Sequence, residues 1–325
     1  AWLLTGDEAY KDKAVDILYD YATAYPKLEI RGARSTSGNT KLSLNSLHSS
    51  YKLPGFAEGY AFIRAGRIPE AKRAKIEHFL LDSATRIAQH SVEYSNQQAE
   101  HFRAYGTAGI TLGFWPLAAE AIHGDFGWHQ VVEYGYSSDG IAHEGGAYHR
   151  AVVHAMNELA LFAWGEGVNL YTARFKRVFD GSLSSGAAQP SLELPYMVYG
   201  DPAYLKDITR RRAGGRIGLD TAMYAPLGVP SAESIPFESE LMRGAGYVFL
   251  RKGTAADNME IALNYVKQFD RHEHDRFTTF FKRNGSRIDS TAGRIAYSAP
   301  NSSWMLATAA HNTIVIDGAS QRGGT

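Results

Sequence analysis

The segment RHEHDRFTTFFKRNGSRIDS, residues 271–290, holds two histidines two positions apart, His272 and His274. In an extended chain, residues two apart point to the same side, so both imidazoles would face one surface. Asp289 follows in the same segment, and His311 lies in the later segment LATAAHNTIVIDG. Nitrogen and oxygen ligands of this kind suit a divalent ion such as zinc or manganese. The pattern fits a metal site, and it also fits surface histidines that flank a hairpin.

The hairpin sets a condition on this metal site. The Asn-Gly pair at 284–285, between two strand-like runs, predicts a tight turn that places Asp289 opposite Phe280. Six residues of extended strand would then separate this position from His274 by roughly 20 Å. A shared metal site therefore requires the chain to turn within residues 273–277, so that His274 folds back.

A second group of reactive side chains follows a glycine-rich loop. The stretch SSDGIAHEGGAYHR, residues 137–150, leads into a helix with an apolar stripe. It brings together an acid, a phenol, an imidazole and a guanidinium: Glu144, Tyr148, His149 and Arg150. Loops held by a rigid scaffold often carry chemistry. A tyrosine at a helix start is more often packed than catalytic, so both interpretations of Tyr148 stay open at this point.

A third group consists of amides in EYSNQQAEHFRAYG, residues 93–106. Asn96 and Gln97 lie where one predicted helix ends and the next begins. Amides at such a junction commonly cap or terminate helices. They can also hydrogen-bond a carboxylate without adding a charge to the site.

Two kinds of element must position these groups. In the first two thirds of the chain, apolar residues recur at helical spacing, over about residues 44–65, 69–94, 99–123 and 147–165. The first such helix follows Asp7, a predicted cap, and has this apolar stripe: Tyr10, Ala14, Ile17, Leu18 and Tyr21. Short connections predict antiparallel helical hairpins. After Pro230, short runs rich in Phe, Val, Ile and Thr predict antiparallel strands.

Composition narrows the class of protein. The 325 residues include 34 basic and 34 acidic side chains, so no overall field favours nucleic acid. Cysteine is absent, which excludes thiolate metal ligands and cysteine nucleophiles. No apolar run is long enough to predict a membrane span. The first residues carry no signal-peptide pattern, and we expect both ends to be cuts in a longer protein.

Four segments occur in an order that resembles one known family: SNQQ, DGIAHEGGAYHR, HEHDRFTTFFKRNGSRIDSTAG and AAHNTIVIDG. The series resembles the heparinase II/III-like superfamily of polysaccharide lyases, which includes oligoalginate lyases and dermatan sulfate epimerase. The resemblance covers most of the chain. It implies an α+β multidomain fold, with an incomplete (α/α) toroid over residues 1–230 and a truncated antiparallel β-sandwich over residues 231–325. In that family the active site lies in the cleft between the two domains.

The resemblance also implies a role for each matching position. Asn96 falls on the group that neutralises the substrate carboxylate, Tyr148 on the catalytic tyrosine and His272 on the catalytic histidine. Three positions fall on the protein ligands of a structural metal, expected to be zinc with manganese second: His274, Asp289 and His311. Gln97 departs from members that have a histidine here and looks closer to heparinase III-like members.

The implied reaction is β-elimination in a polysaccharide that contains uronic acid, of the glycosaminoglycan or alginate type. The enzyme must stabilise the charge that develops when the C5 proton leaves, and an acid–base pair must move the protons. Further residues are expected in substrate subsites: Gln97, Glu144, His149, Arg150 and Arg271. Two alternatives stay open, a uronyl C5-epimerase that forms the same carbanion and a non-catalytic glycan-binding module.

Other expectations concern rival chemistry and context. A glycoside hydrolase requires two opposed carboxylates, and only Glu144 and Asp139 stand out. Trp128 and Tyr134 are candidates for stacking on sugar rings. The resemblance implies a periplasmic or secreted location and an acidic polysaccharide or oligosaccharide as the partner. The sequence does not indicate which polymer is cleaved, whether action is endo or exo, or the oligomeric state.

Overall fold

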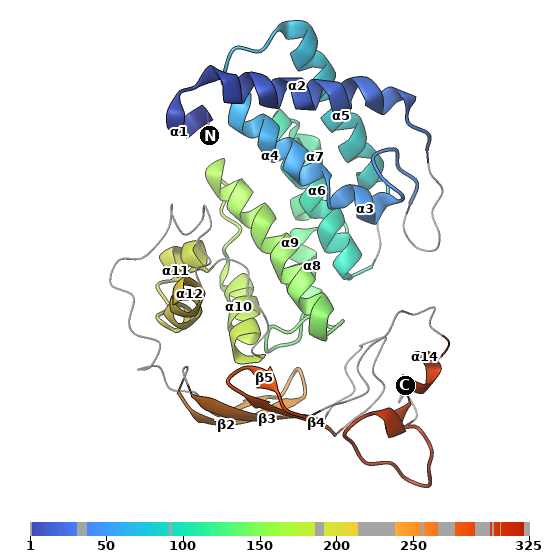
Figure 1. Ribbon diagram of the computed structural model, residues 1–325, viewed down its shortest axis with the longest axis vertical. Helices are drawn as coiled ribbons and strands as arrows, with labels where there is room; N and C mark the ends of the chain where they lie inside the picture. Colours follow the sequence, from blue (N-terminus) through green and yellow to red (C-terminus); the bar gives the residue numbers. More distant parts are fainter. Residues whose placement is uncertain are drawn as a thin grey trace. The chain divides into compact units, whose positions relative to one another are not determined.

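The computed structural model describes residues 2–30, 38–90, 93–185, 192–213, 238–254, 257–265, 277–289, 300, 302–305 and 307–321. Within these residues, helices come first and a five-stranded antiparallel sheet follows (Figure 1). This order confirms the fold class predicted from the sequence, a helical region followed by an antiparallel sheet. Closure of the helices into a toroid and the second sheet of a sandwich stay predictions.

The first helices begin where the sequence supplies a cap or a proline. The carboxylate of Asp7 accepts a hydrogen bond from the N–H of Ala9 at 3.0 Å, which confirms the predicted cap. The described helices are α1 (Trp2–Thr5), α2 (Glu8–Ala24), η1 (Tyr25–Lys27), α3 (Ser46–Ser50), α4 (Leu53–Ile63), α5 (Glu70–Ala88), α6 (Asn96–Leu112), α7 (Trp115–His123), α8 (Trp128–Tyr134), α9 (Gly146–Gly165), α10 (Ala173–Ser185), α11 (Glu193–Tyr199), α12 (Ala203–Ala213), α14 (Ser302–Met305) and η3 (Thr308–Ala310). None of them combines the length and apolar character needed to cross a membrane.

Helix α2 is where the predicted apolar stripe differs from the structure. Its buried residues are Lys11, Val15, Leu18 and Ala22. Three residues of the predicted stripe are exposed instead: Tyr10, Ile17 and Tyr21. Ile17 and Tyr21 line a groove of about 510 Å³ between α2 and α4. The helix carries two neighbouring apolar faces, and sequence spacing alone does not select the one that packs.

Helix α6 runs through the centre of the helical part, and its residues 98–111 are all buried. Two glycines allow α7 to approach it closely. A Cβ on Gly106 would lie 2.8 Å from the Cβ of Ala121, and one on Gly109 would lie 2.8 Å from the backbone nitrogen of Ala118. Only glycine fits such contacts, so α6 meets α7 backbone against backbone along this face.

The chain divides into two compact units. Unit 1 comprises residues 1–135 and 154–170, and unit 2 comprises residues 136–153 and 171–325. Helix α9 therefore contributes its first turns to unit 2 and the rest of its length to unit 1. The predicted domain boundary at residue 230 lies outside the described residues and stays a prediction.

The sheet is a simple meander in the order β1 (Glu240–Met242), β2 (Tyr247–Gly253), β3 (Asn258–Asn264), β4 (Thr278–Arg283) and β5 (Ser286–Arg287). Asn284 and Gly285 both have positive φ, 50° and 77°, as a tight hairpin turn of the predicted kind requires. The N–H of Ile288 bonds the carbonyl of Phe281 at 3.0 Å, which continues the β4–β5 register. That register places Asp289 opposite Phe280, as predicted.

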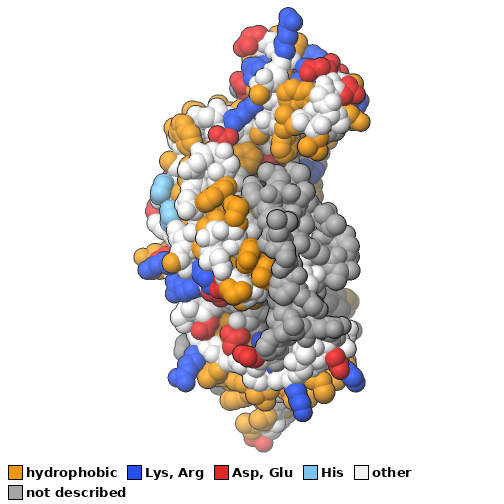
Figure 2. All heavy atoms as spheres, turned by 90° about the vertical axis from the view of Figure 1, so that its left-hand side faces the viewer, with side chains coloured by type: hydrophobic (Ala, Val, Ile, Leu, Met, Phe, Trp, Pro, Cys, Tyr) orange, Lys and Arg blue, Asp and Glu red, His pale blue; other side chains and the backbone are white. Residues whose placement is uncertain are grey.

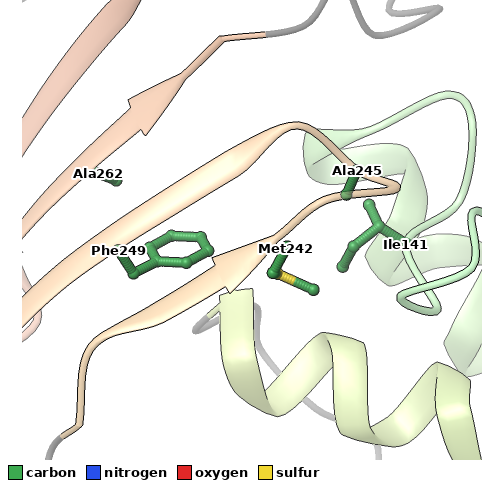
Figure 3. Packing of buried hydrophobic residues seen from close by; sticks show 5 residues of the cluster. All are labelled: Ile141, Met242, Ala245, Phe249 and Ala262. Carbon is green, nitrogen blue, oxygen red and sulfur yellow. The ribbon is translucent and has the colours of Figure 1, made fainter.

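One face of the sheet packs into the interior of unit 2. Figure 3 shows Met242, Phe249 and Ala262 of this face, together with Ala245 of the β1–β2 turn and Ile141 of the preceding loop. All five are buried, so the loop that carries Ile141 forms part of the hydrophobic core beneath the sheet. The glycine-rich segment before Tyr148 is therefore attached to the sheet through packing.

The opposite face of the sheet is apolar and exposed. It carries Leu241, Leu250, Met259, Ile261 and Phe281. The register pairs Ile261 with both Leu250 and Phe281, so these side chains form one continuous surface. Figure 2 shows hydrophobic side chains gathered in the region of the sheet. A second sheet, as in the predicted sandwich, would cover such a face.

Candidate active site

Asn96 is the first residue of the central helix α6. The hydroxyl of Ser95 accepts a hydrogen bond from the N–H of Gln98 at 3.3 Å, so Ser95 supplies the helix cap. Asn96 and Gln97 are half-buried, whereas Gln98 is buried and donates to the carbonyl of Phe126 at 3.3 Å. Since Ser95 provides the cap, the sequence does not need Asn96 for that purpose.

Tyr148 lies in the first turn of α9 and is half-buried. His149 is buried and Arg150 is exposed, because successive residues on a helix are rotated by about 100°. Glu144, in the loop before the helix, is half-buried. The three helical side chains therefore face different surroundings, and only His149 points fully into the protein.

His149 ties the loop and two helices together. Its Nδ1 accepts a hydrogen bond from the N–H of Ala142 at 3.1 Å, and its Nε2 lies 2.6 Å from the Oγ of Ser182 in α10. Because Nδ1 must accept, the ring is neutral and Nε2 carries the hydrogen. Burial lowers the pKa of His149 to about 4, which keeps this form. The side chain is only 2% exposed and both nitrogens are engaged, so the substrate contact expected for His149 is not what the structure shows.

Asp139 fixes the same loop to the sheet. Its Oδ2 accepts hydrogen bonds from the N–H groups of Gly244 and Ala245, the latter at 2.9 Å, in the β1–β2 turn. Gly140 has a φ of 77°, and a Cβ there would lie 1.9 Å from the carbonyl oxygen of Arg177 in α10. The carboxylate of Asp139 is committed to backbone donors, which argues against the hydrolase pair that the sequence left open.

Residues 266–276, which include the two neighbouring histidines, lie outside the described residues. The positions of Arg271, His272 and His274 therefore stay predictions. The next described residue, Phe277, has a φ of 61°, a left-handed conformation that is rare for a bulky side chain. The backbone is therefore not extended at Phe277, the residue directly before β4. Phe277 is the last residue of the interval 273–277, within which the chain must turn if His274 is to share a metal site with Asp289.

Asp289 lies beside the segment that carries His311. Its Oδ2 accepts a hydrogen bond from the Nδ2 of Asn312 at 2.8 Å, and its Oδ1 accepts one from the Nε of Arg287 at 3.0 Å. Burial alone would raise the pKa of Asp289, but the hydrogen bond and charge of Arg287 and the bonds from Phe281 and Asn312 hold it below its ordinary value. The carboxylate is therefore ionised, as a metal ligand must be.

The proposed metal triad is incomplete in the part of the chain that the structure describes. Those residues contain no group of three or more histidine or carboxylate side chains arranged to hold a metal. The third expected ligand, His274, falls outside them. The placement of Asp289 next to Asn312, the neighbour of His311, fits the expected set, and ligating carboxylates are commonly hydrogen-bonded in this way.

A buried charged cluster lies on the same helix as Asn96, and sequence reasoning missed it. Glu100 and Arg103 form an ion pair at 2.7 Å, Arg103 also pairs with Glu158 of α9, and it donates to the carbonyl of Ser50 at 3.3 Å. Burial raises the pKa of Glu100 to about 7, although Arg103 opposes the shift. Spacings of four and three place Asn96, Glu100 and Arg103 on one helix face. The available signal was an acid and a base three apart, Glu100 and Arg103, in a predicted helix.

The two aromatics considered for sugar stacking have different positions. Trp128 is 0% exposed, and its Nε1 donates to the carbonyl of Met156 at 3.3 Å, so it belongs to the core and cannot contact a sugar. Tyr134, the last residue of α8, is 59% exposed. The expectation for Trp128 was wrong because a large aromatic at a helix start gives no sign of the face on which it packs.

Comparison with known proteins gives two sequence relatives. No family model matches the chain. It is 24% identical over 366 residues to an alginate lyase from Stenotrophomonas maltophilia (strain K279a), covering 97% of this chain and 49% of that protein. It is also 24% identical over 370 residues to an exo-oligoalginate lyase from Saccharophagus degradans, covering 97% of this chain and 50% of that protein. The chain thus spans about half the length of these relatives.

The fold has a match among solved structures. The crystal structure of a heparan sulfate lyase HepC mutant from Pedobacter heparinus superposes with a TM-score of 0.59 at 16% sequence identity, covering 98% of this chain and 52% of that chain. The helices and antiparallel sheet therefore have a heparinase-like fold. With the sequence similarity, this supports a relationship to a heparinase- and alginate-lyase-like superfamily, as the four motifs indicated.

Proposed function

We propose that this protein is a polysaccharide lyase that cleaves a uronic-acid-containing polysaccharide by β-elimination. The observation that carries the proposal is the similarity to two alginate lyases over 97% of the chain. That span includes the segments with Asn96, Tyr148 and His272. The first substrate to test is an alginate-type uronate polymer, since both relatives are alginate lyases by name, and heparan sulfate follows. The location outside the cytoplasm implied by the resemblance belongs to the same proposal.

The first step is to hold the uronate carboxylate so that its α-proton, on C5, becomes removable. In this proposal the Asn96 amide donates a hydrogen bond to the carboxylate, and Gln97 assists from the next position. Asn96 is also at the start of a long helix, where backbone N–H groups and the helix dipole favour negative charge. Both effects stabilise the enolate-like charge that develops when the proton leaves.

The second step is the transfer of protons. Tyr148 and His272 form the acid–base pair: one takes the proton from C5 and the other protonates the oxygen that leaves C4. The electrons of the C5–H bond form the new C4–C5 double bond as the C4–O bond breaks. Glu144, Arg150 and Arg271 are assigned to neighbouring subsites, where the guanidinium groups bind carboxylates or sulfates.

A divalent metal ion, zinc or manganese, belongs to the proposal as a structural element. His274, Asp289 and His311 would hold it. Such an ion would link these three positions, which are far apart in the sequence, and so stabilise the folded chain. The ionised state of Asp289 and its bond to Asn312 support this donor set.

The test is an absorbance assay for the unsaturated uronate product on alginate, heparan sulfate, chondroitin sulfate and hyaluronan. We expect product with at least one polymer and none with the Tyr148→Phe variant. Incorporation of solvent deuterium at C5 without unsaturated product would replace the lyase by an epimerase. Binding to a polymer with neither reaction would reduce the protein to a glycan-binding module.

A further inference from the structure

Three aromatic side chains gather beside Asn96 in unit 1, and we call them the aromatic platform: Tyr94, Phe126 and Tyr134. The ring of Tyr94 lies in the middle, with its centroid 5.0 Å from Phe126 and 6.0 Å from Tyr134. Tyr94 and Phe126 are half-buried, whereas Tyr134 is largely exposed. Only Ser95 separates Tyr94 from Asn96, so their Cα atoms are at most about 7.6 Å apart. The backbone that carries Asn96 therefore lies within a few ångströms of the backbone that carries the central ring of the platform.

The amide of Gln130 fixes the platform from one side. Its Oε1 accepts hydrogen bonds from the hydroxyl of Tyr94 and from the backbone N–H of Phe126, both at 3.2 Å. A backbone N–H can only donate, so the oxygen of this amide must face Phe126 and Tyr94. The two N–H donors of this amide make no hydrogen bond to the part of the chain that the structure describes. A donor pair next to an exposed aromatic ring can receive sugar hydroxyls.

Phe126 holds an unusual backbone conformation at this place. Its φ is 57°, in a region that bulky residues rarely adopt. The conformation is held on both sides, because the Phe126 carbonyl accepts from Gln98 and its N–H donates to Gln130. Such strain persists only where the surroundings determine it, and it is often found at ligand sites. Here it directs an aromatic ring toward Tyr94 in the turn between α7 and α8.

We propose that the aromatic platform is a sugar subsite, which holds the pyranose ring adjoining the one whose carboxylate Asn96 receives. This inference rests on the proposed function. The carbon–hydrogen face of a sugar ring stacks on the exposed ring of Tyr134, and the Gln130 amide donates to a hydroxyl. Asp125 and Glu93, next to the platform in the chain, are exposed acids. They disfavour a carboxylate on that side, so the stacked sugar turns its own carboxylate away from them.

The subsite contributes affinity that does not depend on the charge of the ligand. Aromatic contacts of this kind are worth a few-fold to about ten-fold in binding beyond the area they bury. The experiment is calorimetric titration of alginate oligosaccharides, from disaccharide to hexasaccharide, and of their carboxyl-reduced forms. The protein carries Tyr148→Phe to prevent turnover. Tyr134→Ala and Gln130→Ala are compared with Tyr10→Ala, which removes an exposed tyrosine on α2.

We expect Tyr134→Ala to weaken binding about three- to ten-fold for native and carboxyl-reduced oligosaccharides alike, and Gln130→Ala to act in the same direction. Tyr134→Phe should restore most of the affinity, and Tyr10→Ala should have no effect. Unchanged affinity in Tyr134→Ala, or the absence of binding by the parent protein, would overturn the subsite. Lyase activity is measured separately on the protein that retains Tyr148. If that protein is inactive while binding still depends on Tyr134, the subsite is supported and the lyase proposal is refuted, so the two failures are distinguishable.

Discussion

The Nδ1 atom of His149, the residue directly after Tyr148, accepts a hydrogen bond from the backbone N–H of Ala142 at 3.1 Å. The same ring bonds Ser182 through Nε2, so one neutral imidazole connects the glycine-rich loop, α9 and α10. The backbone next to Tyr148 is therefore held by an acceptor nitrogen, Nδ1, which exists only in the neutral form of His149. This relationship makes the stability of the region depend on pH.

His149→Gln should reduce the acid sensitivity of the protein. The folded pKa of His149 is about 4, below its ordinary value near 6.5, because burial disfavours the charged ring. Between these two values the unfolded chain binds more protons, so stability falls as pH falls. The full loss is on the order of 3 kcal/mol, and it is complete below about pH 4.

Urea unfolding at pH 7.0 and pH 4.5 measures this effect. The difference between the two pH values should be smaller in His149→Gln than in the parent protein. His78→Gln, at an exposed position of α5, is the matched control and should behave like the parent. Equal pH dependence in all three proteins would show that His149 does not carry the sensitivity.

Asp139→Ala should destabilise unit 2 by about 1–3 kcal/mol. The substitution leaves the N–H groups of Gly244 and Ala245 without their carboxylate acceptor. Asp139→Asn retains one acceptor oxygen and should recover part of the loss. Thermal melts compare both variants with Asp125→Ala, an exposed acid. A melting temperature equal to that of the parent would mean that the loop does not depend on this contact.

The predicted metal site separates two neighbouring histidines by function. His274→Ala should lower the melting temperature in the same way as chelation, because metal that binds only the folded state stabilises it by mass action. His272→Ala should remove turnover and leave the metal content unchanged. Elemental analysis with melts and rates on both variants decides the matter. A protein without bound metal, or exchanged effects of the two substitutions, would contradict the assignment.

Features set by neighbours in sequence could be predicted, and features set by tertiary packing could not. The Asp7 cap, the Asn284–Gly285 turn and the Asp289 register follow from local chemistry, and the structure has all three. The order of helices and sheet follows from periodicity in the same way. The buried positions of His149 and Trp128 depend on elements distant in sequence, so their residue types alone gave the wrong role.

The order of motifs assigned roles to particular residues through the family resemblance, and these roles stay predictions. It selected Asn96 and Tyr148, which lie in the first turns of α6 and α9. It gave no sign of the charged cluster of Glu100 and Arg103, whose partners Glu158 and Ser50 come from other helices. The exposed face of α2 was missed because two apolar faces compete there.

Mass spectrometry of the products of alginate cleavage tests the central claim most directly, with the parent protein and Tyr148→Phe compared in parallel. Elimination through Tyr148 predicts products whose summed mass equals that of the substrate with no water added, together with a rate at least about 100-fold lower in the variant. Thermal melts should show the variant folded like the parent. Products that have gained water, or near-equal rates of the two folded proteins, would contradict β-elimination through Tyr148.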